Sequence, residues 1–161
     1  MNLMQMKQAS IRTPLGIATI IGDENGVQEI KVDDPTKESS EIPEVLQSAI
    51  LQLQQYFSGK RESFDLQLNP KGTDFQKKVW EELKNIPYGA TVSYLELSRK
   101  LGDEKAIRAV AAANGKNPLW IVVPCHRVIG SNGSLTGYAG GLHRKKWLLD
   151  LENPPSQQSL F

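Results

Sequence analysis

A break at residues 69–72, where the sequence reads Asn-Pro-Lys-Gly, separates two stretches with different hydrophobic periodicity. Before the break, residues 17–21 and 27–32 are rich in β-branched side chains and flank an Asn-Gly pair, which is typical of a tight hairpin turn. After the break, apolar residues recur every three or four positions, as in amphipathic helices. The sequence therefore predicts an α/β (α+β) chain, with a small antiparallel sheet first and a mostly helical part after it.

The expected N-terminal domain, residues 1–70, combines a sheet with one helix. Apolar residues recur at helical spacing from Leu46 to Phe57, and a Ser-Gly pair follows and ends the helix. Apolar residues then alternate at positions 64, 66 and 68, which predicts a third, half-buried strand. Because no chemically active cluster stands out here, we expect this domain to be a scaffold.

The expected C-terminal domain, residues 71–152, contains two capping boxes. Thr73 with Gln76, and Ser93 with Glu96, have the spacing at which two side chains cap the start of a helix. Each pair therefore predicts the first residue of a helix.

A third helix is expected over residues 103–114, directly after a Gly-Asp turn. Two short helices joined in this way indicate a helix-turn-helix. Five of the ten residues from 105 to 114 are alanines. Small side chains let such a helix approach either a neighbouring helix or a DNA groove. Residues 153–161 are polar and contain proline, and are expected to form a flexible tail.

Residues 119–123 form an apolar run that leads into Cys125. We expect Cys125 to lie at the end of a buried strand. A hairpin or wing is expected to follow over residues 128–138, with a turn in its middle. The last helix is expected to carry the basic residues 144–146 on its exposed side.

Composition limits the chemistry available to the chain. A single cysteine allows neither an internal disulfide nor a cysteine-based zinc site, and with two histidines we expect no metal. No apolar run is long enough to span a membrane, and no signal-peptide pattern begins the sequence, so a reducing cytoplasm is expected. Residues 1–70 carry 6 basic and 10 acidic side chains, a net of −4, whereas residues 71–161 carry 13 and 8, a net of +5. This asymmetry favours a polyanionic partner for the second half.

The Cys125–His126 pair is the candidate reactive centre. Thiolate chemistry needs a rigidly held sulfur with a base or a positive charge beside it, and His126 and Arg127 follow directly in the sequence. The alternative is a buried structural cysteine beside a solvated histidine. The neighbouring sequence decides between these two interpretations.

The sequence Pro-Cys-His-Arg-Val at residues 124–128 resembles the active-site motif of the O6-alkylguanine-DNA alkyltransferases (methylated-DNA–protein-cysteine methyltransferases). The likeness extends over residues 72–152 and is weaker over the first 70. It is carried by Gly-Thr-Asp-Phe-Gln at 72–76, Ile-Pro-Tyr-Gly at 86–89, Ser-Tyr at 93–94, Arg-Ala-Val at 108–110, Asn-Pro at 117–118 and Tyr-Ala-Gly-Gly-Leu at 138–142.

The resemblance implies that Cys125 attacks the alkyl carbon on O6 of an extruded guanine and keeps the alkyl group irreversibly. His126 would deprotonate the thiol through a water, and Glu152 would orient the imidazole. Asn117 would fix the turn that carries Cys125, and Arg127 would pair with an acid or the backbone. Each molecule would act once and would need no cofactor.

Further roles implied by the resemblance concern substrate and DNA. Tyr94 would hydrogen-bond the extruded guanine or press on its phosphate, and Arg108 would fill the gap that the base leaves. Position 139 is alanine where some relatives place a hydroxyl, so a contact to O6 there would come from the backbone. The residues expected to line the base pocket are Tyr94, Arg108, Val128, Tyr138, Ala139 and Gly140. Those expected to contact DNA are Ser93, Arg108, Ala109, Ala112, Ala113, Asn114 and Lys116.

The implied partner is double-stranded DNA carrying O6-alkylguanine, with O4-alkylthymine as a further candidate substrate, and a monomer is expected. The final residues Gln157, Ser159, Leu160 and Phe161 resemble the peptide by which bacterial repair proteins bind the sliding clamp, although Gln158 stands where leucine is usual. Three alternatives compete with the alkyltransferase hypothesis. A non-catalytic lesion-binding relative would lack the cysteine, a helix-turn-helix regulator would have no use for the Cys-His pair, and a cysteine hydrolase would not need a DNA-binding pattern.

Overall fold

The computed structural model describes residues 6–34 and 37–154, which fall into two compact units. The first unit comprises Met1–Lys71 together with Pro118–Val122, and the second comprises Gly72–Asn117 together with Val123–Phe161. The chain thus returns to the first unit for a short segment that lies inside the expected domain of residues 71–152. The candidate clamp-binding residues 157–161 lie outside the described residues.

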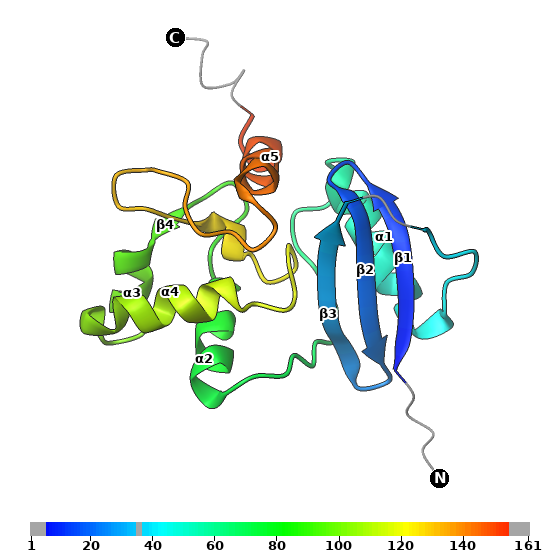
Figure 1. Ribbon diagram of the computed structural model, residues 1–161, viewed down its shortest axis with the longest axis horizontal. Helices are drawn as coiled ribbons and strands as arrows, with labels where there is room; N and C mark the ends of the chain where they lie inside the picture. Colours follow the sequence, from blue (N-terminus) through cyan, green and yellow to red (C-terminus); the bar gives the residue numbers. More distant parts are fainter. Residues whose placement is uncertain (1–5, 35–36, 155–161) are drawn as a thin grey trace. The chain divides into compact units, whose positions relative to one another are not determined.

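The first unit is a three-stranded antiparallel sheet with one helix (Figure 1). Strands β1 (Lys7–Thr13), β2 (Gly16–Asp23) and β3 (Gly26–Asp33) follow one another in the order β1-β2-β3. A single-turn helix, η1 (Glu44–Leu46), leads into α1 (Gln47–Phe57), whose Leu53 and Tyr56 are fully buried. The Asn-Gly hairpin and the helix are therefore confirmed.

The predicted strand at residues 64–68 is wrong. Only Leu68 pairs there, in an isolated bridge to Val27, and the third strand is β1 instead. The side-chain amide of Gln52 accepts from the Asp65 N–H at 2.9 Å and donates to the Asp65 carbonyl at 3.0 Å. It thereby occupies the backbone groups that a strand would use for pairing. Of the three alternating apolar residues, Phe64 packs its ring against Tyr56 of α1, with 5.6 Å between the ring centroids.

The apolar run before Cys125 forms a turn, not the predicted strand. The Ile30 N–H donates to the Pro118 carbonyl at 2.8 Å, and the Trp120 N–H donates to the Ile30 carbonyl at 3.2 Å. Pairing stops there because Ile121 has a φ of 76°, a left-handed conformation that β-branched residues seldom adopt. Cys125 instead begins a single 3₁₀ turn, η3 (Cys125–Arg127).

The second unit is mostly helical. It contains α2 (Asp74–Leu83), α3 (Tyr94–Lys100), η2 (Glu104–Ala106), α4 (Ile107–Gly115) and α5 (Leu142–Glu152), with short strands β4 (Val92–Ser93) and β5 (Val128–Ile129) paired in parallel. Both predicted capping boxes are confirmed, with reciprocal hydrogen bonds at the starts of α2 and α3. The turn between α3 and α4 also forms as predicted, and Gly102 takes a φ of 91° in it.

The segment after Cys125 is a loop rather than a hairpin. The Gly130 N–H donates to the Ser134 carbonyl at 2.9 Å and closes a turn. Within the described residues β5 pairs only with β4, so no second strand returns beside it. Among the described helices, none is long and apolar enough to cross a membrane.

Candidate active site

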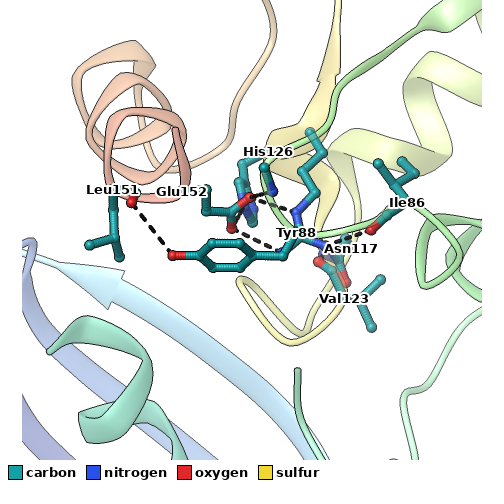
Figure 2. Close-up of polar contacts among 9 residues, drawn as sticks. Ile86, Tyr88, Asn117, Val123, His126, Leu151 and Glu152 are labelled. Atoms are coloured by element: carbon teal, nitrogen blue, oxygen red, sulfur yellow. Dashed lines mark hydrogen bonds and ion pairs between the residues drawn. The ribbon is translucent and has the colours of Figure 1, made fainter. Parts of the chain in front are cut away.

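The turn that carries Cys125 is held by the side chain of Asn117. The Asn117 Nδ2 donates to the Val123 carbonyl at 2.8 Å (Figure 2). The Cys125 N–H donates to the same carbonyl at 2.8 Å. Cys125 is 4% exposed and Asn117 is 3% exposed. Asn117 thus bonds the turn that carries Cys125, as expected, and this buried turn is held by two hydrogen bonds to one carbonyl.

The thiol of Cys125 is protonated at neutral pH. Burial raises its pKa to about 11, although the Asn117 side chain and the charge of Lys145 both act to lower it. A thiol with this pKa is a weak nucleophile, because the thiolate is the reactive form. Any reaction at this sulfur therefore needs a base.

His126 is fully buried and hydrogen-bonds to Glu152 through one ring nitrogen. Its Nε2 lies 2.7 Å from Glu152 Oε2, as drawn in Figure 2. Burial lowers the pKa of His126, despite the opposing effect of Glu152, so the ring is neutral at pH 7. The carboxylate requires the proton on Nε2, which leaves the Nδ1 lone pair available as a base. Nδ1 has no hydrogen-bond partner among the described residues.

Glu152 lies at the end of α5 and joins His126 to Arg127. Arg127 donates from Nε to Glu152 Oε1 at 2.8 Å and from its second terminal nitrogen to Oε2 at 3.0 Å. It also donates to the Ile86 carbonyl at 2.6 Å, so the expected pairing of Arg127 with an acid and with backbone is confirmed. Burial raises the pKa of Glu152, but the hydrogen bonds from His126 and Arg127 outweigh it and lower the pKa to about 2. Glu152 is thus a permanent anion.

Lys145 is a site residue that sequence reasoning missed. The prediction that it lies on the exposed side of the last helix is wrong, because Lys145 is 0% exposed. Its Nζ donates to the Val128 carbonyl at 2.6 Å and to the Thr136 carbonyl at 2.7 Å. Burial lowers its pKa to about 8, and the Cys125 thiolate acts to raise it. One signal was present, since Lys145 precedes Leu148 and Glu152 at the spacing of a single buried helix face.

Two tyrosines lie close enough to Cys125 for its charge to affect them. Tyr94 donates from its hydroxyl to the Thr136 carbonyl at 3.3 Å, and Tyr138 is 9% exposed. Burial raises the pKa of both phenols, and the Cys125 thiolate raises each further. Of the other expected pocket residues, Val128 and Gly140 are buried and Ala139 is exposed.

The residues expected to contact DNA divide into an exposed and a buried group. Ser93 is buried, and its hydroxyl caps α3 by accepting from the Glu96 N–H. Ala113 and Asn114 are also buried, so their side chains point into the protein and are not available to a DNA groove in this conformation. We define the α4 face as the four exposed residues, which lie at i, i+1, i+4 and i+8 on one side of the helix: Arg108, Ala109, Ala112 and Lys116.

Known proteins resemble the chain over nearly its whole length. The family described as "6-O-methylguanine DNA methyltransferase, DNA binding domain" matches residues 74–154, and its "ribonuclease-like domain" matches residues 6–70. The methylated-DNA–protein-cysteine methyltransferase of Methanosarcina acetivorans is 47% identical over 156 residues, covering 91% of this chain and 98% of the relative. The enzyme of the same name from Mycolicibacterium paratuberculosis is 45% identical, covering 94% of each chain.

Solved structures give the same result. The Mycobacterium tuberculosis O6-methylguanine methyltransferase is 42% identical with a TM-score of 0.83, covering 92% of this chain and 93% of that one. The M. tuberculosis OGT in complex with DNA is 44% identical with a TM-score of 0.82, covering 90% and 92%. The chain therefore belongs to the 6-O-methylguanine DNA methyltransferase family.

Proposed function

We propose that Cys125 takes the alkyl group from O6-alkylguanine in DNA and keeps it as a thioether. Family membership makes the chain a methylated-DNA–protein-cysteine methyltransferase that repairs O6-methylguanine. One observation supports Cys125 as the acceptor. The only cysteine of the chain is buried beside a neutral histidine whose Nε2 is engaged by Glu152 and whose Nδ1 is left unpaired.

The transfer begins with removal of the thiol proton by His126 Nδ1, through a bridging water as the resemblance implies. The imidazolium that forms is stabilised by Glu152, which stays ionised because its pKa is about 2. The sulfur then attacks the alkyl carbon, the C–S bond forms and the C–O6 bond breaks. The electron pair passes into the purine, and the proton from the thiol is formally returned to N1, which restores guanine.

Lys145 supplies the positive charge that this transfer needs. Its ammonium lowers the pKa of Cys125, and its two hydrogen bonds hold the loop from Val128 to Thr136. Thiolate formation next to a cation is favoured. We assign Lys145 two roles: its charge stabilises the Cys125 thiolate, and its hydrogen bonds hold the loop over residues 128–136 in place.

Double-stranded DNA carrying the lesion is the proposed partner, and the α4 face is its proposed contact. The four residues of this face are exposed, and two of them are basic. A relative of 44% identity has been solved in complex with DNA. Because a stacked base cannot reach a buried sulfur, the target nucleotide must be extruded, and Arg108 would occupy the gap. O4-alkylthymine is retained as a candidate second substrate.

A non-catalytic lesion-binding protein is the runner-up function. Such a protein needs the pocket but neither the nucleophile nor its base. The Cys125–His126–Glu152 arrangement favours the transferase, because it supplies a nucleophile, a base for the thiol and a carboxylate that orients the base.

Intact-protein mass tests the proposal. After incubation with duplex DNA containing O6-methylguanine, the protein should gain the mass of one CH₂ group and never two. Cys125→Ser should gain none while still binding the lesion. Tight binding without any mass gain in the wild type would instead support the lesion-binding alternative.

A second partner is proposed from the sequence alone. Gln157, Ser159, Leu160 and Phe161 resemble a sliding-clamp peptide. A version of the protein ending at Asn153 should bind purified clamp more weakly than the full chain, and equal binding would refute the idea.

A reducing cytoplasm is the proposed compartment, because alkyl transfer to Cys125 requires an unmodified thiol. The proposed oligomeric state is a monomer.

A further inference from the structure

The turn from Ile86 to Gly89, which follows α2, contacts the buried pair of Arg127 and Glu152 at three points. The Ile86 carbonyl accepts a hydrogen bond from Arg127 Nη1 at 2.6 Å. The guanidinium carbon of Arg127 lies over the ring of Tyr88, 5.7 Å from the ring centroid. The Gly89 N–H donates to Glu152 Oε1 at 3.3 Å. This one turn therefore touches both charged groups of the pair.

Tyr88 contacts the pair mainly through its ring. Its hydroxyl donates to the Leu151 carbonyl, in the last turn of α5, at 3.5 Å (Figure 2). A hydrogen bond of this length is weak. The ring contact is stronger, because an aromatic face attracts a cation and the attraction grows where water is excluded. Arg127 is 6% exposed, so this condition is met.

The position of the Arg127 guanidinium decides how Glu152 meets His126. Arg127 binds both carboxylate oxygens of Glu152, and His126 Nε2 shares one of them, Oε2. The donors of a guanidinium form a planar, rigid fork, so a tilt of its plane turns the bound carboxylate with it. Such a tilt would lengthen the 2.7 Å contact between His126 and Glu152 and weaken the preference for the proton on Nε2. Part of the molecules would then carry the proton on Nδ1, the nitrogen that must accept the thiol proton.

We infer that Tyr88 is a positioning residue for alkyl transfer, whose ring holds the Arg127 guanidinium in the plane that keeps the His126 proton on Nε2. Tyr88 acts through Arg127 and Glu152 and takes no part in the proton transfer itself. The inference rests on the proposed function, which uses Nδ1 as the base. Gly89 belongs to the same device, because its φ of 82° disfavours other residues and a Cβ there would lie 3.3 Å from the Glu152 carbonyl oxygen.

Nuclear magnetic resonance reads the tautomer of His126 directly. In protein with ring ¹⁵N-labelled histidine, the chemical shifts of the two ring nitrogens show which one carries the proton. The chain has two histidines, and His126→Gln identifies the signals of His126. Wild type should carry the proton on Nε2 in nearly all molecules. Tyr88→Leu should show a measurable fraction with the proton on Nδ1, whereas Tyr88→Phe, which keeps the ring, should match wild type.

A shape-preserving replacement separates the electrostatics of the ring from its packing. Pentafluorophenylalanine at position 88 keeps the outline of phenylalanine but removes the negative charge from the ring face, so it no longer attracts a cation. It should give mixed His126 tautomers, as Tyr88→Leu does. This variant also decides the matter if Tyr88→Leu does not fold.

Transfer rates from O6-methylguanine in duplex DNA should follow the tautomers. Under single-turnover conditions Tyr88→Leu and the fluorinated variant should be slower by about tenfold, the effect of losing a cation–π contact away from water. Tyr88→Phe should stay within about twofold of wild type, because it loses only the weak hydrogen bond to Leu151.

Tyr56→Leu is the matched control for loss of a tyrosine ring from the protein interior. Tyr56 is fully buried in the first unit, where its ring contacts Phe57 and Phe64. This variant should lower the melting temperature at least as much as Tyr88→Leu does. It should nevertheless leave the His126 tautomer and the transfer rate of the folded protein unchanged.

Several results would overturn the inference. These are a single Nε2 tautomer in Tyr88→Leu or in the fluorinated variant, equal slowing by Tyr88→Phe and Tyr88→Leu, and mixed tautomers in Tyr56→Leu, which would show that any loss of packing is enough. Absence of transfer to the wild-type protein is a separate outcome that would refute the proposed function, and the tautomer measurement would still decide the role of Tyr88.

Discussion

Replacement of His126 by glutamine should make transfer depend on the small fraction of Cys125 that ionises unaided. The amide of glutamine can still donate to Glu152, so the buried ion pair with Arg127 is preserved, but the amide cannot accept the thiol proton. Burial, Asn117 and Lys145 set the Cys125 pKa of about 11, so the pKa stays high in the variant. At pH 7.5 this gap leaves about one thiolate per 3,000 molecules, and the rate should fall by up to about 10³-fold.

The pH profile gives the sharper measurement. Single-turnover rates should be collected by rapid quench between about pH 6.5 and pH 7.5, where Lys145, with a pKa of about 8, keeps most of its charge. The His126→Gln rate should rise about tenfold for each pH unit, because thiolate forms in that proportion. The wild-type rate should be nearly flat, because His126 is neutral throughout this range. A variant with a near-wild-type rate, or with an equally flat profile, would refute the assignment of His126 as the base.

Four further predictions follow from the same contacts. Glu152→Gln should lower the free energy of unfolding by roughly 3–5 kcal/mol, measured in urea, because it leaves the Arg127 cation buried without a counter-charge. In the wild type, the Glu152 pKa of about 2 lies below its ordinary 4.5, so the stabilisation by ionised Glu152 is complete above pH 4.5 and is lost as the pH falls toward 2. The free energy of unfolding should fall by about 3 kcal/mol over this range, and Glu152→Gln should not show this fall. Lys145→Met should slow transfer by about tenfold and speed amide hydrogen exchange in the loop over residues 128–136, whereas an unchanged rate would exclude its electrostatic role. Arg108→Ala should change the free energy of unfolding by less than about 0.5 kcal/mol. It should slow alkyl transfer from O6-alkylguanine in duplex DNA more than transfer from the free O6-alkylguanine base, and equal slowing would refute the role of Arg108 in the gap that the extruded base leaves in the duplex.

Local signals in the sequence predicted the starts of the helices correctly. The capping boxes at Thr73 and Ser93 use side chains three residues apart, so their hydrogen bonds depend on nothing distant in the chain. The hairpin before β3 is local in the same way. These features can be predicted from the sequence because the interacting atoms are neighbours along the backbone.

Contacts between residues far apart in the chain could not be predicted from the sequence. The strand predicted at residues 64–68 fails because Gln52, 13 positions away, binds the Asp65 backbone. Lys145 looked exposed because lysine usually is, and only the Val128 and Thr136 carbonyls explain its burial. Asn114 was assigned to DNA from its place on a helix, whereas the fold turns it toward Cys125. The errors at Lys145 and Asn114 concern which face of a helix is buried.

The central claim is that Cys125 irreversibly takes one alkyl group and restores guanine. The most direct measurement incubates excess protein with DNA carrying a methyl-labelled O6-methylguanine, then maps the label by peptide mass spectrometry and quantifies the nucleosides. The account predicts label on the Cys125 peptide alone, with one guanine restored for each labelled protein and no turnover on further addition of substrate. Label on another residue, or loss of O6-methylguanine without labelled protein, would contradict it.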